Sequence, residues 1–139
     1  MKTLCKCLAI VAVVVLVPLS RAADDETPNI NKRGDDEKAF VEKLGTAIVR
    51  AARTSVKTAT LKSYEKKTPK EGRLEYHIKA GWKGAVLGKE QTSDVVVIVD
   101  SSDKNAWEVL RIEYSDDEKG LIPFNRKNIG EMVKKLNAK

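Results

Sequence analysis

The sequence predicts an α+β fold: one long N-terminal helix packed on a four-stranded antiparallel meander, with a short C-terminal helix. Two observations lead to this prediction. Apolar residues recur at helical spacing in residues 35–57, and from residue 58 the apolar period changes to two in four successive runs. Short polar turns separate these runs, and strands joined by short turns usually pair with their sequence neighbours.

Residues 1–22 have the pattern of a signal peptide. Lys2 and Lys6 precede an apolar run over residues 8–17, which is followed by Pro18 and then by the small residues Ser20 and Ala22. We expect cleavage after Ala22 and export to the periplasm or the extracellular space. The apolar run is shorter than the roughly 20 residues of a membrane-spanning helix, so we expect no permanent membrane anchor.

Cleavage of this segment changes the cysteine content and the net charge of the mature chain. Both cysteines, Cys5 and Cys7, leave with it, so the mature chain can form no disulfide. Three basic residues leave as well, which lowers the net charge from +6 to +3. The remaining 117 residues are enough for one domain with a core of its own. A net charge this small in an exported domain argues against nucleic acid as a partner.

The mature chain is expected to begin with a flexible leader at residues 23–34, followed by a single α+β domain at residues 35–139. The leader is polar and has no apolar period to bury. The helix predicted for residues 35–57 is acidic at its start and basic at its end, which complements the helix dipole. Gly45 lies in its middle, so it marks either a bend or a close approach to the sheet.

The four strands are expected at residues 58–68, 73–83, 91–100 and 106–114, and the tail helix at residues 126–136. The second strand is the clearest, because Leu74, Tyr76 and Ile78 alternate with charged residues. The tail helix has apolar residues at helical spacing, preceded by the capping residue Asn125.

Several candidate chemical sites fail on their ligand chemistry. The run after the third strand, Asp100 to Asn105, lacks the residues of known Asp-containing metal or nucleophile loops, and its composition is typical of a hairpin turn. His77, the single histidine, alternates outward with Glu75 and Lys79. We therefore expect no catalytic residue, no cofactor and no metal site, and we expect the protein not to be an enzyme.

The third predicted strand is apolar on both faces, and this suggests a binding surface. Val95, Val97 and Val99 point one way, and Val96 and Ile98 point the other. On the fourth strand, strict alternation puts Trp107 and Val109 opposite Leu110, Ile112 and Tyr114. One helix covers only one face of a sheet, so the second face needs the tail helix, another subunit or a ligand. The candidate binding face consists of Val96, Ile98, Trp107 and Val109.

Charge is divided between the two halves of the predicted sheet. Residues 57–89 hold nine basic and three acidic residues, whereas residues 90–120 hold nine acidic and three basic ones. One interpretation is pairing between strands together with solubility. The other is a basic edge that docks on an anionic envelope polymer or another partner.

This order of elements resembles the cystatin-like and NTF2-like folds, and also small exported bacterial proteins of unknown function. The cystatin resemblance implies protease inhibition through a Gln-x-Val-x-Gly hairpin, of which Val86 and Gly88 match two fixed positions while Gly84 replaces the glutamine. The NTF2 resemblance implies a small enzyme with a pocket between helix and sheet. We expect instead an exported, non-enzymatic binding domain, with both alternatives kept open. Its expected partner is a protein, an envelope polymer, a small apolar ligand or a second copy of the chain.

Overall fold

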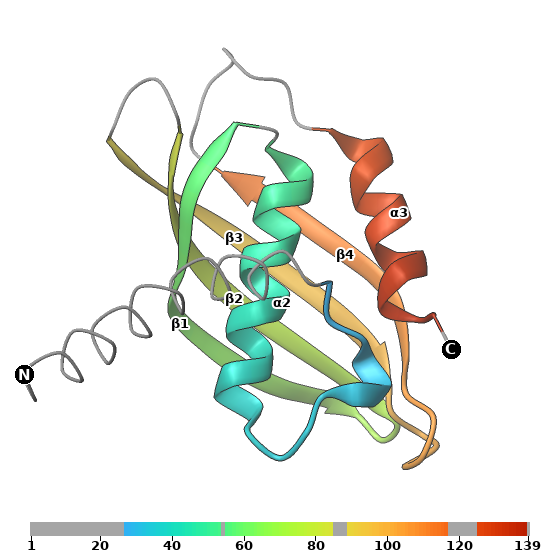
Figure 1. Ribbon diagram of the computed structural model, residues 1–139. Coiled ribbons are helices and arrows are strands. Elements are labelled where there is room, and N and C mark those ends of the chain that lie inside the picture. The colour runs from blue at the N-terminus through green and yellow to red at the C-terminus, as the bar shows by residue number, and fades with distance from the viewer. Residues whose placement is uncertain (1–26, 54, 85–88, 117–124, 139) are drawn as a thin grey trace, which may run out of the picture.

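The computed structural model describes residues 27–53, 55–84, 89–116 and 125–138, and it has two α-helices and a four-stranded antiparallel sheet (Figure 1). The sheet order is β1-β2-β3-β4, so each strand pairs with its sequence neighbours. The elements are η1 (a 3-10 turn, Ile30–Lys32), α2 (Glu37–Ala52), β1 (Val56–Lys70), β2 (Arg73–Gly84), β3 (Glu90–Asp100), β4 (Glu108–Asp116) and α3 (Arg126–Leu136). The α+β class, the antiparallel meander and the two helices are confirmed.

Helix α2 is shorter than the predicted helix at residues 35–57. Asp36 caps its start, because the side chain accepts a hydrogen bond from the backbone N–H of Ala39 at 3.0 Å. The helix ends at Ala52, and Arg53 already has extended backbone angles. From Val56 the chain pairs with β2, opposite Gly84. The last residues of the predicted helix, from Val56 onward, therefore belong to β1, because they pair with β2.

The core lies between the inner face of the sheet and the two helices. Tyr76 and Ile78 of β2 lie opposite Val97 and Val95 of β3 and are almost fully buried. The helix side contributes Phe40, Val41, Leu44, Ile48, Val49 and Ala52 from α2, and Ile129, Met132 and Leu136 from α3. The predicted inner face of the second strand is thus confirmed.

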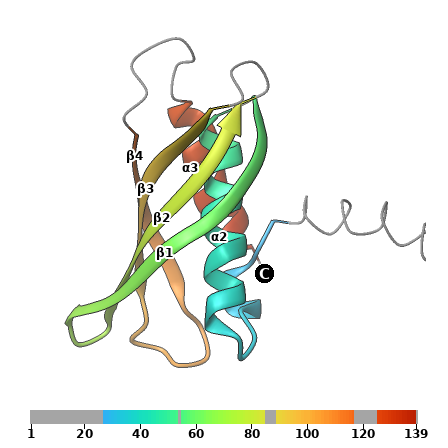
Figure 2. The same ribbon diagram turned by 90° about the vertical axis from the view of Figure 1, so that its left-hand side faces the viewer.

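Helix α3 packs on the same side of the sheet as α2 (Figure 2). It contacts α2 and β4, and Leu136 is fully buried there. The tail helix therefore does not cover the second face of the sheet, and among the described residues no other element does.

The part of the expected leader that the structure describes is packed. Ile30 is fully buried in the core, and Pro28 is buried beside it. Asn29 caps the 3-10 turn, and its side-chain amide donates a hydrogen bond to the Ala138 carbonyl at the end of the chain. One apolar residue in a polar segment has no period to reveal it, so only the tertiary contacts place residues 27–34 in the domain.

Candidate functional site

We call the sheet surface that faces away from α2 and α3 the outer face. Residues opposite one another in an antiparallel register share a face, so the strand pairings assign its members. On the β1 and β2 half, six basic residues are mixed with two acidic ones, a net charge of +4. These residues are Lys62, Lys67, Lys70, Arg73, Lys79, Lys83, Glu65 and Glu75.

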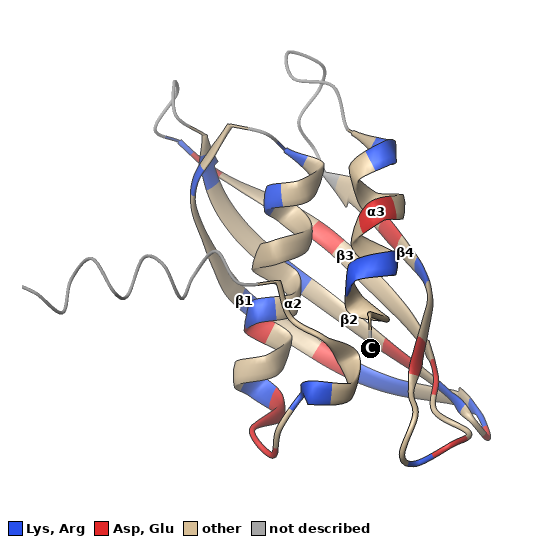
Figure 3. Ribbon diagram, turned by 45° about the vertical axis from the view of Figure 1, so that its right-hand side comes forward, with Lys and Arg blue, Asp and Glu red and all other residues tan. Residues whose placement is uncertain are grey.

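The β3 and β4 half of the outer face has the opposite charge. Five acidic residues and one basic residue give it a net charge of −4, and Figure 3 shows red segments along both strands. These residues are Glu90, Asp94, Asp100, Glu108, Glu113 and Arg111. The charge asymmetry of the sequence is therefore also an asymmetry of one exposed surface.

Some of these charges pair within the molecule. Lys79 Nζ lies 3.2 Å from Asp94 Oδ1 across the boundary between β2 and β3. Lys62 lies over Gly81 and reaches Glu90 at 2.6 Å. Both interactions are exposed, and exposed pairs stabilise a fold by only about 0.2–1 kcal/mol each. Pairing between strands is therefore present, but it contributes little to stability.

One row of paired residues across the sheet has both of its positive charges at one end and both of its negative charges at the other. Lys70 pairs with Arg73, Arg73 with Asp100, and Asp100 with Glu108. The row runs from two positive side chains on β1 and β2 to two negative ones on β3 and β4. The sequence showed the charge difference between halves, but only the register brings these four residues into one line.

The four residues of the predicted binding face do not lie together. Val96 and Ile98 are on the outer face, where Val96 is half-buried and Ile98 is 9% exposed. Val109 instead belongs to the core on the inner face and is 1% exposed. Trp107 precedes β4 and packs against the core from its rim.

A β-bulge at Leu110 explains this difference from the prediction. Val99 pairs with Val109 and Ile98 pairs with Arg111, so Leu110 has no partner on β3. The extra residue reverses the alternation, which puts Val109 and Ile112 on the same side of the sheet. Leu110 is 41% exposed and is the one large apolar side chain in the described chain that is exposed to this extent. It takes the place that Val109 was expected to hold.

Trp107 and Val109 are held at the free edge of β4 by two asparagines. Asn31 accepts from the Trp107 N–H at 2.9 Å and donates to its carbonyl at 3.0 Å. Asn137 does the same for Val109, at 2.8 and 2.9 Å. Each side-chain amide thus makes the two backbone hydrogen bonds that a residue of a neighbouring strand would make. The Arg33 guanidinium lies 3.6 Å from the centroid of the Trp107 ring, which covers that residue further.

The segment after β3 is the predicted hairpin turn. Asp100 Oδ1 accepts hydrogen bonds from the Ser102 N–H at 3.0 Å and the Ser102 hydroxyl at 2.6 Å. Asp103 accepts from the Asn105 N–H at 2.9 Å. The two bonds from Ser102 lower the pKa of the Asp100 carboxyl below its usual value.

His77 lies on the outer face, where its Nε2 is 3.0 Å from Glu75 Oε1. A shallow depression of about 290 Å³ surrounds it and includes Asp94 and Val96. Within the described ranges, no group of three or more His, Cys, Asp or Glu side chains is arranged to hold a metal ion.

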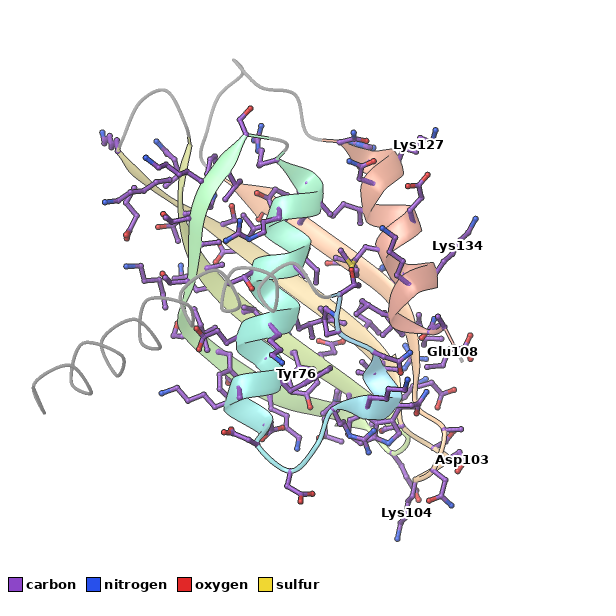
Figure 4. All side chains as sticks on the ribbon, viewed as in Figure 1. Tyr76, Asp103, Lys104, Glu108, Lys127 and Lys134 are labelled. Atoms are coloured by element: carbon purple, nitrogen blue, oxygen red, sulfur yellow. The ribbon has the colours of Figure 1, made fainter. Side chains whose placement is uncertain are left out.

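Polar groups on the inner face bond to one another. The Trp82 indole N–H donates to Ser93 Oγ at 2.8 Å, and that oxygen is 2.7 Å from the Tyr114 hydroxyl. The Tyr76 hydroxyl donates to Glu37 Oε1 at 3.2 Å, beneath the start of α2 (Figure 4). Burial, and then the negative charge of Glu37, raise the pKa of the Tyr76 hydroxyl well above its usual value.

Comparisons with protein-family models, with curated proteins and with solved structures each find no match to this chain. The segment that carries the cystatin resemblance, residues 84–88, lies outside the described residues except for Gly84. Among the described residues, no helix is both long enough and apolar enough to cross a membrane.

Proposed function

We propose that the protein is an exported, non-enzymatic interaction domain, and that its outer face docks on a second copy of the chain. The observation that carries this proposal is the division of one uncovered sheet face into halves of equal and opposite net charge. Export follows from the signal-peptide pattern of residues 1–22.

A charge pattern of this kind is complementary to itself. A two-fold axis that lies between two facing sheets, parallel to the strands, places β1 of one copy over β4 of the other. Lys70 and Arg73 then face Glu108 and Asp100 of the second copy, and both sets of contacts form twice. In the two middle rows the same axis places Lys67 over Arg111 and Glu65 over Glu113. Each of these charges has an opposite charge beside it on its own strand, which reduces this repulsion.

The outer face is large enough for a modest interface. Four strands about 4.8 Å apart and about 33 Å long cover roughly 600 Å² per copy, so a dimer buries about 1,200 Å², the low end of specific interfaces. The apolar contribution is small, because it comes mainly from Leu110 and the partly exposed Val96. The dimer is therefore held largely by charge and weakens when salt screens it.

The inner face supports a binding role over an enzymatic one. An NTF2-like enzyme needs polar groups that face a substrate between helix and sheet. Here the Trp82, Ser93 and Tyr114 polar groups bond to one another, and the Tyr76 hydroxyl bonds to Glu37. The space between helices and sheet is filled by apolar side chains.

Sedimentation of the purified protein tests the docking. We expect concentration-dependent dimers that dissociate as the salt concentration rises from roughly 0.02 to 0.5 M. Lys70→Glu and Glu108→Lys should each abolish dimers when studied alone, because each places like charges across the axis. An equal mixture of the two variants should restore them as a heterodimer.

Lys127→Glu is the matched control, because Lys127 is an exposed lysine of α3 on the opposite side of the molecule (Figure 4). It should dimerise like the unmodified protein. A monomer at every salt concentration, or a mixture that fails to restore association, would rule out the proposed partner. Intact mass of the exported protein checks the cleavage site, and retention of residues 1–22 would contradict export by cleavage.

A further inference from the structure

We propose that a basic cleft on the helix side of the molecule is a second binding site. It binds a multiply charged oxyanion, built from phosphate or carboxylate groups. The cleft measures about 500 Å³ and lies where the N-terminal segment, the start of α2 and the end of α3 meet. It is independent of the outer face, since none of the residues that line it belongs to the sheet.

Cations from three separate elements line this cleft. Lys32 belongs to η1, Lys43 to α2 and Lys135 to α3, and Arg33 follows η1. The fold therefore brings together four positive charges that are up to about a hundred positions apart in the sequence. Like charges repel one another, and a bound anion would relieve this repulsion.

The three lysines of the cleft lack a carboxylate partner of the kind that some lysines of the sheet have. Lys62, Lys66 and Lys79 each lie within 3.2 Å of a carboxylate oxygen. Within the described part of the chain, Lys32, Lys43 and Lys135 have no carboxylate within 4.0 Å. Two acids, Asp35 and Asp36, also line the cleft, but an oxygen of Asp36 is engaged in capping α2. The cleft keeps a net positive charge.

Surrounding contacts hold Arg33 and the segment that carries Lys32 in place. Arg33 donates a hydrogen bond to the Ile30 carbonyl at 3.0 Å while its guanidinium lies on the Trp107 ring. Asn29 ties the N-terminal segment to the carbonyl of Ala138 at the end of the chain. Because these contacts hold Arg33 and the backbone beside it, the cleft is partly preorganised, which lowers the cost of binding.

The residues that line the cleft also determine which class of ligand fits it. Lysine ammonium groups bind phosphate and carboxylate oxygens as point charges, without the forked geometry of arginine. Phe40 and Ala39 provide apolar surface beside the charges. A volume of this size accommodates a small molecule or the end of a polymer chain. A compact oxyanion with several charges fits this lining better than a neutral or cationic ligand.

Titration with inorganic pyrophosphate, followed by amide NMR at constant ionic strength, tests the site. We expect saturable shifts at residues 32–36, at Lys43 and at Lys135. Each of Lys32→Gln, Lys43→Gln and Lys135→Gln should weaken binding about two- to five-fold, the effect of one exposed charge contact. The triple variant should lose saturable binding. Citrate in a parallel titration shows whether phosphate or carboxylate groups bind more tightly.

Lys104→Gln and Lys127→Gln are the controls, because both lysines are exposed at the surface away from the cleft (Figure 4). They should bind pyrophosphate like the unmodified protein. The cleft lysines are exposed, so the variants should keep the dispersed spectrum of the folded chain. Non-saturating shifts, or controls that weaken binding as much as the cleft variants do, would overturn the proposal.

Discussion

Gly45 of α2 lies directly against Ile78 of β2. A β-carbon at position 45 would be 2.8 Å from Ile78 Cγ2, closer than real contacts of this kind. Of the two meanings that the sequence left open for Gly45, a bend or a close approach, the structure shows the close approach.

Gly45→Ala should therefore lower stability even though alanine is the better helix former. Alanine gains up to about 1 kcal/mol of helix propensity, but overpacking a core costs about 1–3 kcal/mol. A β-carbon added at Gly130 of α3 would meet no atom within 4 Å, so Gly130→Ala should raise the melting temperature. Thermal unfolding of both variants measures these opposite effects, and stabilisation of both would show that the contact with Ile78 relaxes freely.

Asn137→Ala should destabilise the edge of β4. The change removes two hydrogen bonds to the Val109 backbone in a partly buried place, which costs about 1–3 kcal/mol. It also exposes part of a strand edge, which favours self-association by strand pairing. Urea unfolding and light scattering should detect both effects. Asn105→Ala is the control, because among the described residues the Asn105 side chain makes no hydrogen bond, and the prediction fails if the two variants behave alike.

Removal of the residues after Asn125 should lower the melting temperature markedly or promote self-association. The deletion uncovers the side of the core that Ile129, Met132 and Leu136 bury. Full burial of such side chains contributes roughly 1.5–3 kcal/mol each, against a total stability of about 5–15 kcal/mol. Calorimetry and sedimentation measure the outcome. A truncated chain that stays monomeric with an unchanged melting temperature would show that α3 does not stabilise the core.

Tyr76 should make the fold sensitive to alkali. Its folded-state pKa is raised, so its contribution to stability is fully present below the unfolded-state pKa of about 10 and is lost as pH rises further. Unfolding free energies measured from neutral to alkaline pH should fall more steeply for the unmodified protein than for Tyr76→Phe. Identical pH profiles for the two proteins would contradict the assignment.

Ser102→Ala should raise the pKa of Asp100 toward its usual value. The substitution removes the hydroxyl bond that contributes most to lowering this pKa, and it leaves the backbone N–H of residue 102 in place. Because the folded-state pKa is lowered, the turn is stabilised above the unfolded-state pKa, and the effect is lost as pH falls through the folded value. Carboxyl NMR titration measures the shift. An unchanged titration curve would show that the hydroxyl bond is not formed in solution.

The sequence by itself was enough to predict the regular elements. The alternation of Leu74, Tyr76 and Ile78, and the helical spacing around Leu44, are local patterns that survive in the folded chain because each element buries one face. The hairpin after Asp100 was also predictable, because Asp and Ser satisfy turn backbone with their own side chains.

Only the tertiary structure decided which surfaces remain exposed. The bulge at Leu110 exchanges the faces of Leu110 and Val109, and a bulge depends on how two strands align, which no single run of residues records. The packing of Ile30 likewise depends on distant elements that cover it.

The two proposed sites also depend partly on the sequence and partly on the tertiary structure. The opposite charge of the two halves of the sheet was visible in the sequence, because neighbouring strands are neighbouring segments. The row from Lys70 to Glu108 needed the register of three strand pairs. The basic cleft needed the meeting of η1, α2 and α3, and local periodicity carries no information on how elements so far apart along the chain come together.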